Sequence, residues 1–294
     1  MKKSALAAAT LTTLLWSGSY IVNRLAFAEG IGPLTLSGLR YFTASLVLML
    51  ALRETNPERP ALPLFKAFCI GLVSYVMGQG FQYIGQSYLT PTMASMILNG
   101  GMILFIVLID RIQLRESVNK SVYVKVMLLL GGMLLYFSPW GAVPQRISAP
   151  GVLFMAMASL GAALNVTINR YMLKNRNVRI KELSVRPMFF GGTVMLLAGV
   201  LSEPMPLWSG KLALFIAYLS LVSGATGFAL WVWSQQFLTS MQSGSINTAM
   251  LIEITLLDVL LFSRVVSGVQ WVGIGAVFIA IVAIQVTRDG DGRR

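Results

Sequence analysis

Apolar residues occur in long runs that are separated by short clusters of charged residues, proline and glycine. Each run is close to the roughly 20 residues that an α-helix needs to cross about 30 Å of hydrocarbon. The pattern therefore predicts helices, because lipid cannot satisfy free backbone groups and the short alternating segments of a membrane barrel are absent. We expect ten membrane-spanning helices, at residues 4–26, 34–52, 64–85, 91–110, 122–138, 150–171, 183–202, 210–236, 241–262 and 267–287.

The first run has a second interpretation. Lys2 and Lys3 precede an Ala/Leu-rich segment, as in a secretory signal peptide. The apolar pattern continues past the core length of about 7–15 residues that such peptides use, and it has a counterpart in mid-chain. We therefore expect this run to remain in the protein as its first helix.

The amino-acid composition narrows the range of possible functions. Of the 294 residues, 56% are apolar and 12% are charged, about half of the roughly 25% that soluble domains carry, and the mean hydropathy is +0.72. An ordinary soluble enzyme is therefore excluded. The chain has no histidine, and its single cysteine, Cys69, lies inside an apolar run. We expect no metal site, no cofactor, no disulfide and no catalytic residues.

The net charge of +12 is explained by topology rather than by nucleic acid, because the basic residues fall mainly in loops. With the N-terminus inside, 17 of the 23 Lys and Arg residues lie on the cytoplasmic side. The outer side has Arg146, Lys211 and Arg264, and the spans contain Arg24, Arg40 and Arg170. This distribution predicts a multi-pass protein of the inner membrane with both termini cytoplasmic.

The two halves of the chain resemble each other. An offset of 146 residues superposes Asn23-Arg24-Leu25 on Asn169-Arg170-Tyr171, and an offset of 149 superposes Gln86 on Gln235. Five spans in each half make the second copy enter the membrane from the opposite side, as in the inverted repeats of secondary transporters. We expect repeats at residues 1–143 and 150–287, followed by a cytoplasmic tail at 288–294.

Several short motifs resemble EamA-type members of the drug/metabolite transporter superfamily. They are Trp16-Ser17-Gly18, Pro33 before Leu39-Arg40-Tyr41-Phe42, Leu89-Thr90-Pro91 and Arg115-Glu116. The resemblance implies a ten-helix fold of two five-helix repeats and export of small metabolites such as amino acids or amines.

Polar and aromatic residues share faces of several predicted spans. Along the third span, polar and aromatic residues recur three or four residues apart on a face that lipid would not favour, namely Tyr75, Gln79, Gln82, Tyr83 and Gln86. Such a face either lines a cavity or bonds helix to helix, and spacing leaves both open. The candidate substrate-binding residues are Trp16, Tyr20, Tyr75, Gln79, Gln82, Tyr83, Asn99, Asn165, Trp231, Gln235 and Glu253.

Three charged residues inside spans stand out because burying a charge in the bilayer is costly. Glu253 lies mid-way along the ninth span and is a candidate for proton coupling, for binding a cationic substrate, or for an ion pair with Arg40 or Arg24. Arg40 is either an interfacial side chain, a partner of Glu253 or a ligand for a substrate carboxylate. Asp258 lies about 140° around the helix from Glu253, and we expect it to be solvated or to cap a helix.

The leading hypothesis is a secondary-active exporter of amino acids, amines or related small metabolites, working by alternating access through a central cavity. Alternatives are an uptake carrier, a channel-like permease and a membrane-embedded enzyme. An enzyme is disfavoured because no nucleophile, metal cluster or carboxylate pair stands at a persuasive spacing. The expected partners are a small-molecule substrate and the lipid bilayer, and the chain is expected to be a monomer or a weak homodimer.

Overall fold

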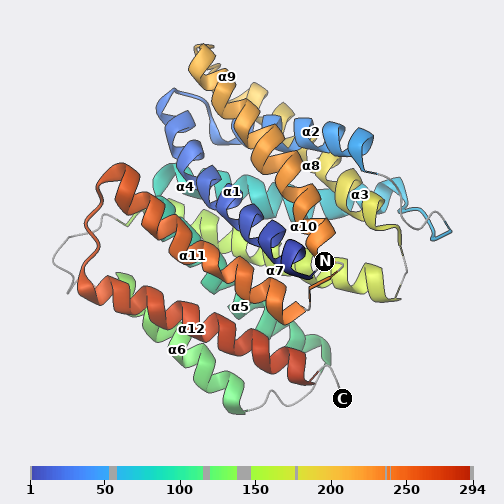
Figure 1. Ribbon diagram of the computed structural model, residues 1–294. Helices are drawn as coiled ribbons and strands as arrows, with labels where there is room; N and C mark the ends of the chain where they lie inside the picture. Colours follow the sequence, from blue (N-terminus) through green and yellow to red (C-terminus); the bar gives the residue numbers. More distant parts are fainter. Residues whose placement is uncertain are drawn as a thin grey trace.

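The computed structural model describes residues 2–52, 58–114, 120–137, 147–175, 178–235, 237–238 and 240–291, and these ranges contain helices and no strand. The all-α prediction is confirmed, and a helix lies within each of the ten predicted segments (Figure 1). Their bounds are α1 Lys2–Ala28, α2 Pro33–Ala51, α3 Leu64–Gly71, α4 Phe81–Tyr88, α5 Pro91–Leu114, α6 Lys120–Phe137, α7 Ala149–Asn175, α8 Ile180–Ser202, α9 Gly210–Ala217, α10 Gly227–Gln235, α11 Ser240–Phe262 and α12 Gly268–Asp291.

Two π-helical segments interrupt the third and eighth predicted spans. Leu72–Gly80 (η1) joins α3 to α4, and Tyr218–Thr226 (η2) joins α9 to α10. The two segments lie 146 residues apart, which is the offset at which the sequence superposes on itself. Because π-helical turns are rare and commonly occur at functional sites, their repetition marks corresponding places in the two halves.

Seven helical rods in the described residues are long and apolar enough to cross a membrane, namely α1, α2, α3–α4, α5, α7, α8 and α9–α10. Two shorter apolar stretches lie in α6 and α12, at Tyr123–Phe137 and Gly268–Ile284. Large apolar side chains also point outward, among them Leu50 at 89% exposure and Leu201 at 86%. Such faces are unfavourable in water and favourable in lipid, so the protein spans a membrane.

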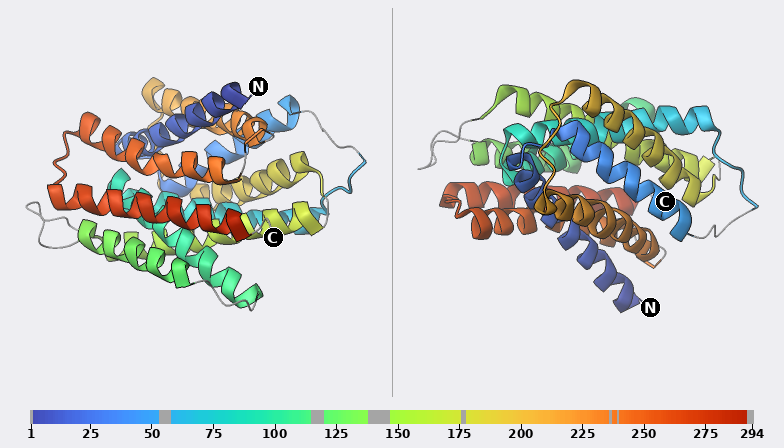
Figure 2. Two further views of the ribbon diagram at one scale, coloured as in Figure 1. Left: turned by 60° about the horizontal axis from the view of Figure 1, so that its bottom comes forward. Right: turned by 90° about the horizontal axis from the view of Figure 1, so that it is seen from above.

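The first half (residues 2–137) and the second half (147–291) are interlocked. Helix α1 packs on α10 and α11 of the second half, and α7 packs correspondingly on α4 and α5 of the first. The remaining long contacts pair α2 with α8 and α6 with α12, and the second pair lies side by side in Figure 1 and in the left view of Figure 2. The interior is therefore formed by helices from both halves.

Small residues bring α2 and α8 close together. A Cβ atom added at Gly38 would collide with the backbone of Leu196, and one added at Gly192 would collide with the backbone of Phe42. The two backbones therefore touch, as is common where membrane helices associate without a hydrophobic driving force between them.

A residue of the second half of the chain caps the start of α2. Pro33 stands in the first turn, where its missing N–H is not needed. The Glu203 carboxylate, which follows α8, accepts hydrogen bonds from the backbone N–H groups of Leu34 and Thr35, each at 2.8 Å. An acid at a helix N-terminus also interacts favourably with the helix dipole. This contact positions α2, which carries Arg40.

Candidate substrate site between the two halves

Arg40 lies on α2 in the interior and is only 5% exposed. Its Nη1 donates to Tyr83 Oη at 2.7 Å, and its Nη2 donates to Ser223 Oγ at 2.9 Å. Its Nε is buried and has no hydrogen-bond partner among the described residues. Tyr83 comes from α4 and Ser223 from η2, so the guanidinium is held by oxygens from both halves.

Phenol and amide groups surround this guanidinium. The Arg40 Cζ atom lies 5.2 Å from the centre of the Tyr41 ring, within the range of a cation–π contact. Tyr41 Oη donates to Gln79 Oε1 at 2.6 Å, and its ring packs edge-on against Tyr75 and Tyr83. We call Arg40, Tyr41, Tyr75, Gln79, Tyr83 and Ser223 the Arg40 cluster.

The Arg40 cluster has a cation but no described anion. In the part of the chain that the structure covers, no carboxylate lies within ion-pair distance of Arg40. A charge removed from water without a counter-ion is costly, and neutral hydroxyls compensate for only part of that cost. The site is therefore electrostatically incomplete.

Glu253 is held elsewhere, by two hydroxyl groups of α1. Thr13 Oγ1 lies 3.0 Å from Glu253 Oε1, and Ser17 Oγ lies 2.7 Å from Glu253 Oε2. The side chain of Glu253 is half-buried. The structure joins it directly neither to Arg40 nor to Arg24.

Helix α1 connects the surroundings of these two charged residues. Trp16 precedes Ser17, and its indole Nε1 donates to the backbone oxygen of Ser223 at 3.0 Å. The Trp16 ring also packs against Trp231 and Phe228 of α10, with centroid distances of 5.3 and 5.4 Å. The predicted residues Trp16 and Trp231 therefore meet beside the Arg40 cluster.

The other predicted residues form hydrogen bonds in different parts of the molecule. Gln82 Nε2 donates to Tyr20 Oη at 3.1 Å, and both side chains are buried next to it. Asn165 accepts hydrogen bonds from Ser74 and Asn169, whereas Asn99 Nδ2 bonds back to the Ser95 carbonyl of its own helix. The side chain of Gln235 and residues Arg115 and Glu116 lie outside what the structure describes.

The backbone N–H of Thr92, in the first turn of α5, donates to Asp258 Oδ2 at 3.4 Å, in keeping with the expected helix-capping role. The expectation of solvent exposure was wrong for Asp258. This residue is fully buried and forms ion pairs with Arg24 at 3.3 Å and with Arg264 at 2.8 Å. It also accepts a hydrogen bond from Thr92 Oγ1 at 2.7 Å. The helical period could not show that Asp258 is covered by residues of α1 and α5.

Arg186 follows Arg40 by 146 residues, which is an offset of the internal repeat, but its surroundings are different. Its Nη2 pairs with Glu182 at 3.1 Å, and its Nη1 donates to the Leu62 carbonyl at 2.6 Å. The repeat-related arginine is thus neutralised where Arg40 is not.

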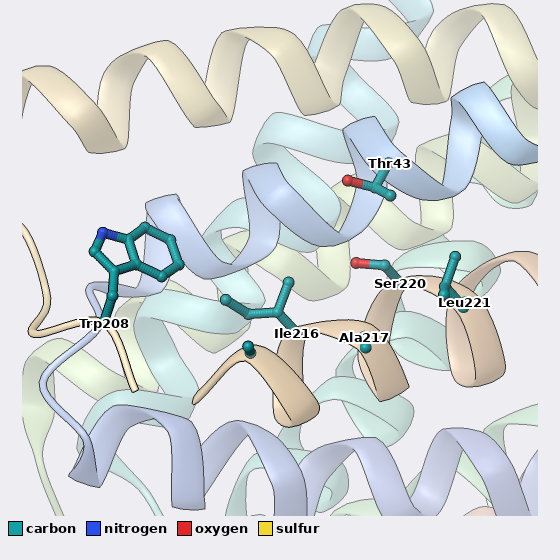
Figure 3. A pocket seen from close by; sticks show the side chains of 7 residues that line it. Thr43, Trp208, Ile216, Ala217, Ser220 and Leu221 are labelled. Carbon is teal, nitrogen blue, oxygen red and sulfur yellow. The ribbon is translucent and has the colours of Figure 1, made fainter. Parts of the chain in front are cut away.

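A groove of about 250 Å³ lies between α2 and the rod formed by α9 and η2 (Figure 3). Thr43 and Ser220 are its polar side chains, and the remaining lining residues are Trp208, Ala213, Ile216, Ala217 and Leu221. None of the predicted site residues lines it. The corresponding region of the other half is closed, because Gly71 and Gly191 bring α3 and η1 against α8.

Comparison with known proteins identifies the family to which this architecture belongs. The model of the EamA-like transporter family matches residues 3–138 and again residues 149–286. The chain belongs to the EamA-like transporter family. The inner membrane transporter YedA of Escherichia coli K12, described as uncharacterized, is 21% identical over 285 residues, covering 93% of this chain and 88% of YedA.

Two further proteins are similar to this EamA-like transporter. A WAT1-related protein of Arabidopsis thaliana is 26% identical over 140 residues, which cover 44% of this chain and 36% of that protein. A protein of known crystal structure shares the fold, with 18% identity, a TM-score of 0.66 and 98% coverage of both chains. The expected family is confirmed, and the protein is a membrane transporter of small molecules.

Sequence reasoning missed Ser223, Tyr41, Thr13 and Ser17 as contributors to these sites. Tyr41 stands next to Arg40 in a motif already noted, so it could have been included. Thr13 and Ser17 are four residues apart on one face of a membrane helix, which is a spacing that marks an inward polar face. Ser223 gave no signal, because its role depends on how η2 packs against α2.

Proposed function

We propose that this EamA-like transporter is a secondary-active exporter of amino acids or related metabolites that carry a carboxylate. The proposal depends on Arg40, a buried guanidinium without an acidic partner among the described residues. A substrate carboxylate would supply the missing counter-charge on binding. An amine without a carboxylate would instead bring a second cation to the same place, and is disfavoured.

The groups around Arg40 favour this class of substrate. The planar guanidinium matches the geometry of a carboxylate, and charge-assisted bonds of this kind are among the strongest in proteins. Tyr83 and Ser223 orient it with neutral oxygens and leave its charge uncancelled. The nearby tyrosines, together with Trp16, offer apolar surface for the rest of the substrate.

Substrate can reach the buried Arg40 only if the helices around it move. The α3–α8 contact is closed and the equivalent α9–α2 contact is opened as a groove. Exchange of these two arrangements would expose Arg40 to one side of the membrane and then to the other. With ten spans and both termini in the cytoplasm, the groove would lie toward the outer side.

Ligand binding by the purified protein tests the substrate class. Amino acids with aliphatic, aromatic and polar side chains are compared with their carboxamides, and with the amines and carboxylic acids that retain one charged group. A bound ligand raises the melting temperature by stabilising the native state. We expect shifts from forms that keep the carboxylate and none from carboxamides or amines; equal shifts from carboxamides would overturn the proposal.

Arg40→Gln provides the second arm of this test. In this variant the substrate carboxylate loses its buried charged partner, which costs about 2 kcal/mol or more of binding free energy. The affinity for the amino acid should therefore fall at least about 30-fold. The ligand-free melting temperature should not fall, because the variant removes an uncompensated charge. Arg186→Gln is the matched control, and it should keep ligand binding. Exchange of labelled for unlabelled amino acid across liposomes separates a carrier from a channel.

A further inference from the structure

The hydroxyl group of Thr13 lies between two oxygens. It is 2.9 Å from the backbone carbonyl oxygen of Thr10 and 3.0 Å from Glu253 Oε1. A hydroxyl carries one proton and can donate only one hydrogen bond, although it can also accept. The Thr10 carbonyl can only accept, so Thr13 must donate to it if that bond is made.

The second short contact then requires a proton from the acid. If Thr13 donates to Thr10, its oxygen remains an acceptor toward Glu253, and only a protonated carboxyl can donate to it. Ser17 donates to the other carboxyl oxygen at 2.7 Å. In this arrangement every polar atom of the group is satisfied, as buried polar groups require. An ionised Glu253 would force Thr13 to abandon one of its two bonds.

No described cation near Glu253 is available to neutralise its carboxylate in place of this proton. On α1, Arg24 pairs with Asp258, and the only other described cation, Lys3, is exposed at the end of the helix. Tyr20 of α1 is engaged by Gln82. The side chains described on α5 and α12 include no titratable group, and α11 itself adds only Asp258. The carboxyl of Glu253 therefore faces hydroxyls and apolar groups.

The geometry points to Glu253 as a proton-binding site that is occupied in this conformation, with the proton on Oε1 and donated to Thr13. The inference stands on these hydrogen bonds alone, whereas the use of the proton in transport rests on the proposed function. Ser17 follows Trp16, whose indole holds the Ser223 backbone, and Ser223 Oγ accepts from Arg40. The same turn of α1 thus contacts both the proton site and the surroundings of Arg40.

Infrared spectroscopy of the purified protein at neutral pH, without substrate, tests the proton directly. The carbonyl stretch of a protonated carboxyl group is well separated from carboxylate bands and shifts on exchange into D₂O. We expect such a band in the wild-type protein and its loss in Glu253→Gln. The amide in this variant can donate to Thr13 and accept from Ser17, so it should fold.

Two variants make the assignment specific. Asp258→Asn should leave the band in place, because Asp258 is held in ion pairs with Arg24 and Arg264 and does not contact Thr13 or Ser17. Ser17→Ala should move it to higher frequency, because the carboxyl oxygen loses its hydrogen-bond donor. Absence of the band in wild-type protein, or its persistence in Glu253→Gln, would overturn the inference while leaving the Arg40 binding test untouched.

Discussion

Two acids on α11, of which Asp258 is fully buried and Glu253 half-buried, lie in opposite electrostatic settings. Asp258 lies between Arg24 and Arg264 and receives a further bond from Thr92. Glu253, five residues earlier, forms its hydrogen bonds only with hydroxyl groups among the described side chains. The first arrangement stabilises a fixed charge and has a structural role. The second can accommodate a neutral acid, as a group that binds and releases a proton must.

Substitution of these two acids should separate their roles. Asp258→Asn leaves the mostly buried Arg264 without its partner, and breaking such a pair costs about 3 kcal/mol or more. We expect its melting temperature in detergent to fall clearly. Glu253→Gln should melt close to wild type, since the amide preserves both hydrogen bonds. Equal destabilisation of the two variants would assign Glu253 a structural role instead.

At the scale of helices, contact between α2 and α8 sets the position of Arg40. Gly38→Ala introduces a methyl group into the backbone of Leu196, and overpacking of this kind costs about 1–3 kcal/mol. Gly275→Ala is the matched control, because its Cβ would meet no atom within 4 Å. We expect a lower melting temperature for the first and an unchanged or slightly raised one for the second. Similar values for both would place the close contact elsewhere.

The sequence predicted the helices well and the side-chain contacts poorly, for a physical reason. Runs of apolar residues are imposed by the thickness of the membrane, so they can be measured along the chain. Contacts such as Ser17 with Glu253 depend on which helices become neighbours. The depth of residues in the membrane could have predicted one contact, the ion pair of Arg24 with Asp258. Each of these residues lies four residues before the end of its helix. Charges at equal depth are natural partners.

At the scale of the whole molecule, the distribution of basic residues predicts the orientation. With Cys69 replaced by serine, a single cysteine at Met205 should react with an impermeant thiol reagent from outside intact cells. A cysteine at Glu58 should react only after the membrane is opened. Both residues are exposed in the structure. The opposite labelling pattern would reverse the orientation and place the α9–α2 groove toward the cytoplasm.

Coupling of the two sites through α1 predicts how transport responds to protons. Release of the proton from Glu253 makes Thr13 exchange its bond to Thr10 for one to the carboxylate, which disturbs the turn that also carries Trp16. An inward proton gradient should therefore accelerate efflux of the amino acid that binds most tightly from liposomes containing wild-type protein. Glu253→Gln, fixed in the neutral form, should keep exchange of that amino acid and lose the acceleration. If the variant still responds to the gradient, the proton at Glu253 is not the coupled one, and the driving ion binds at another site.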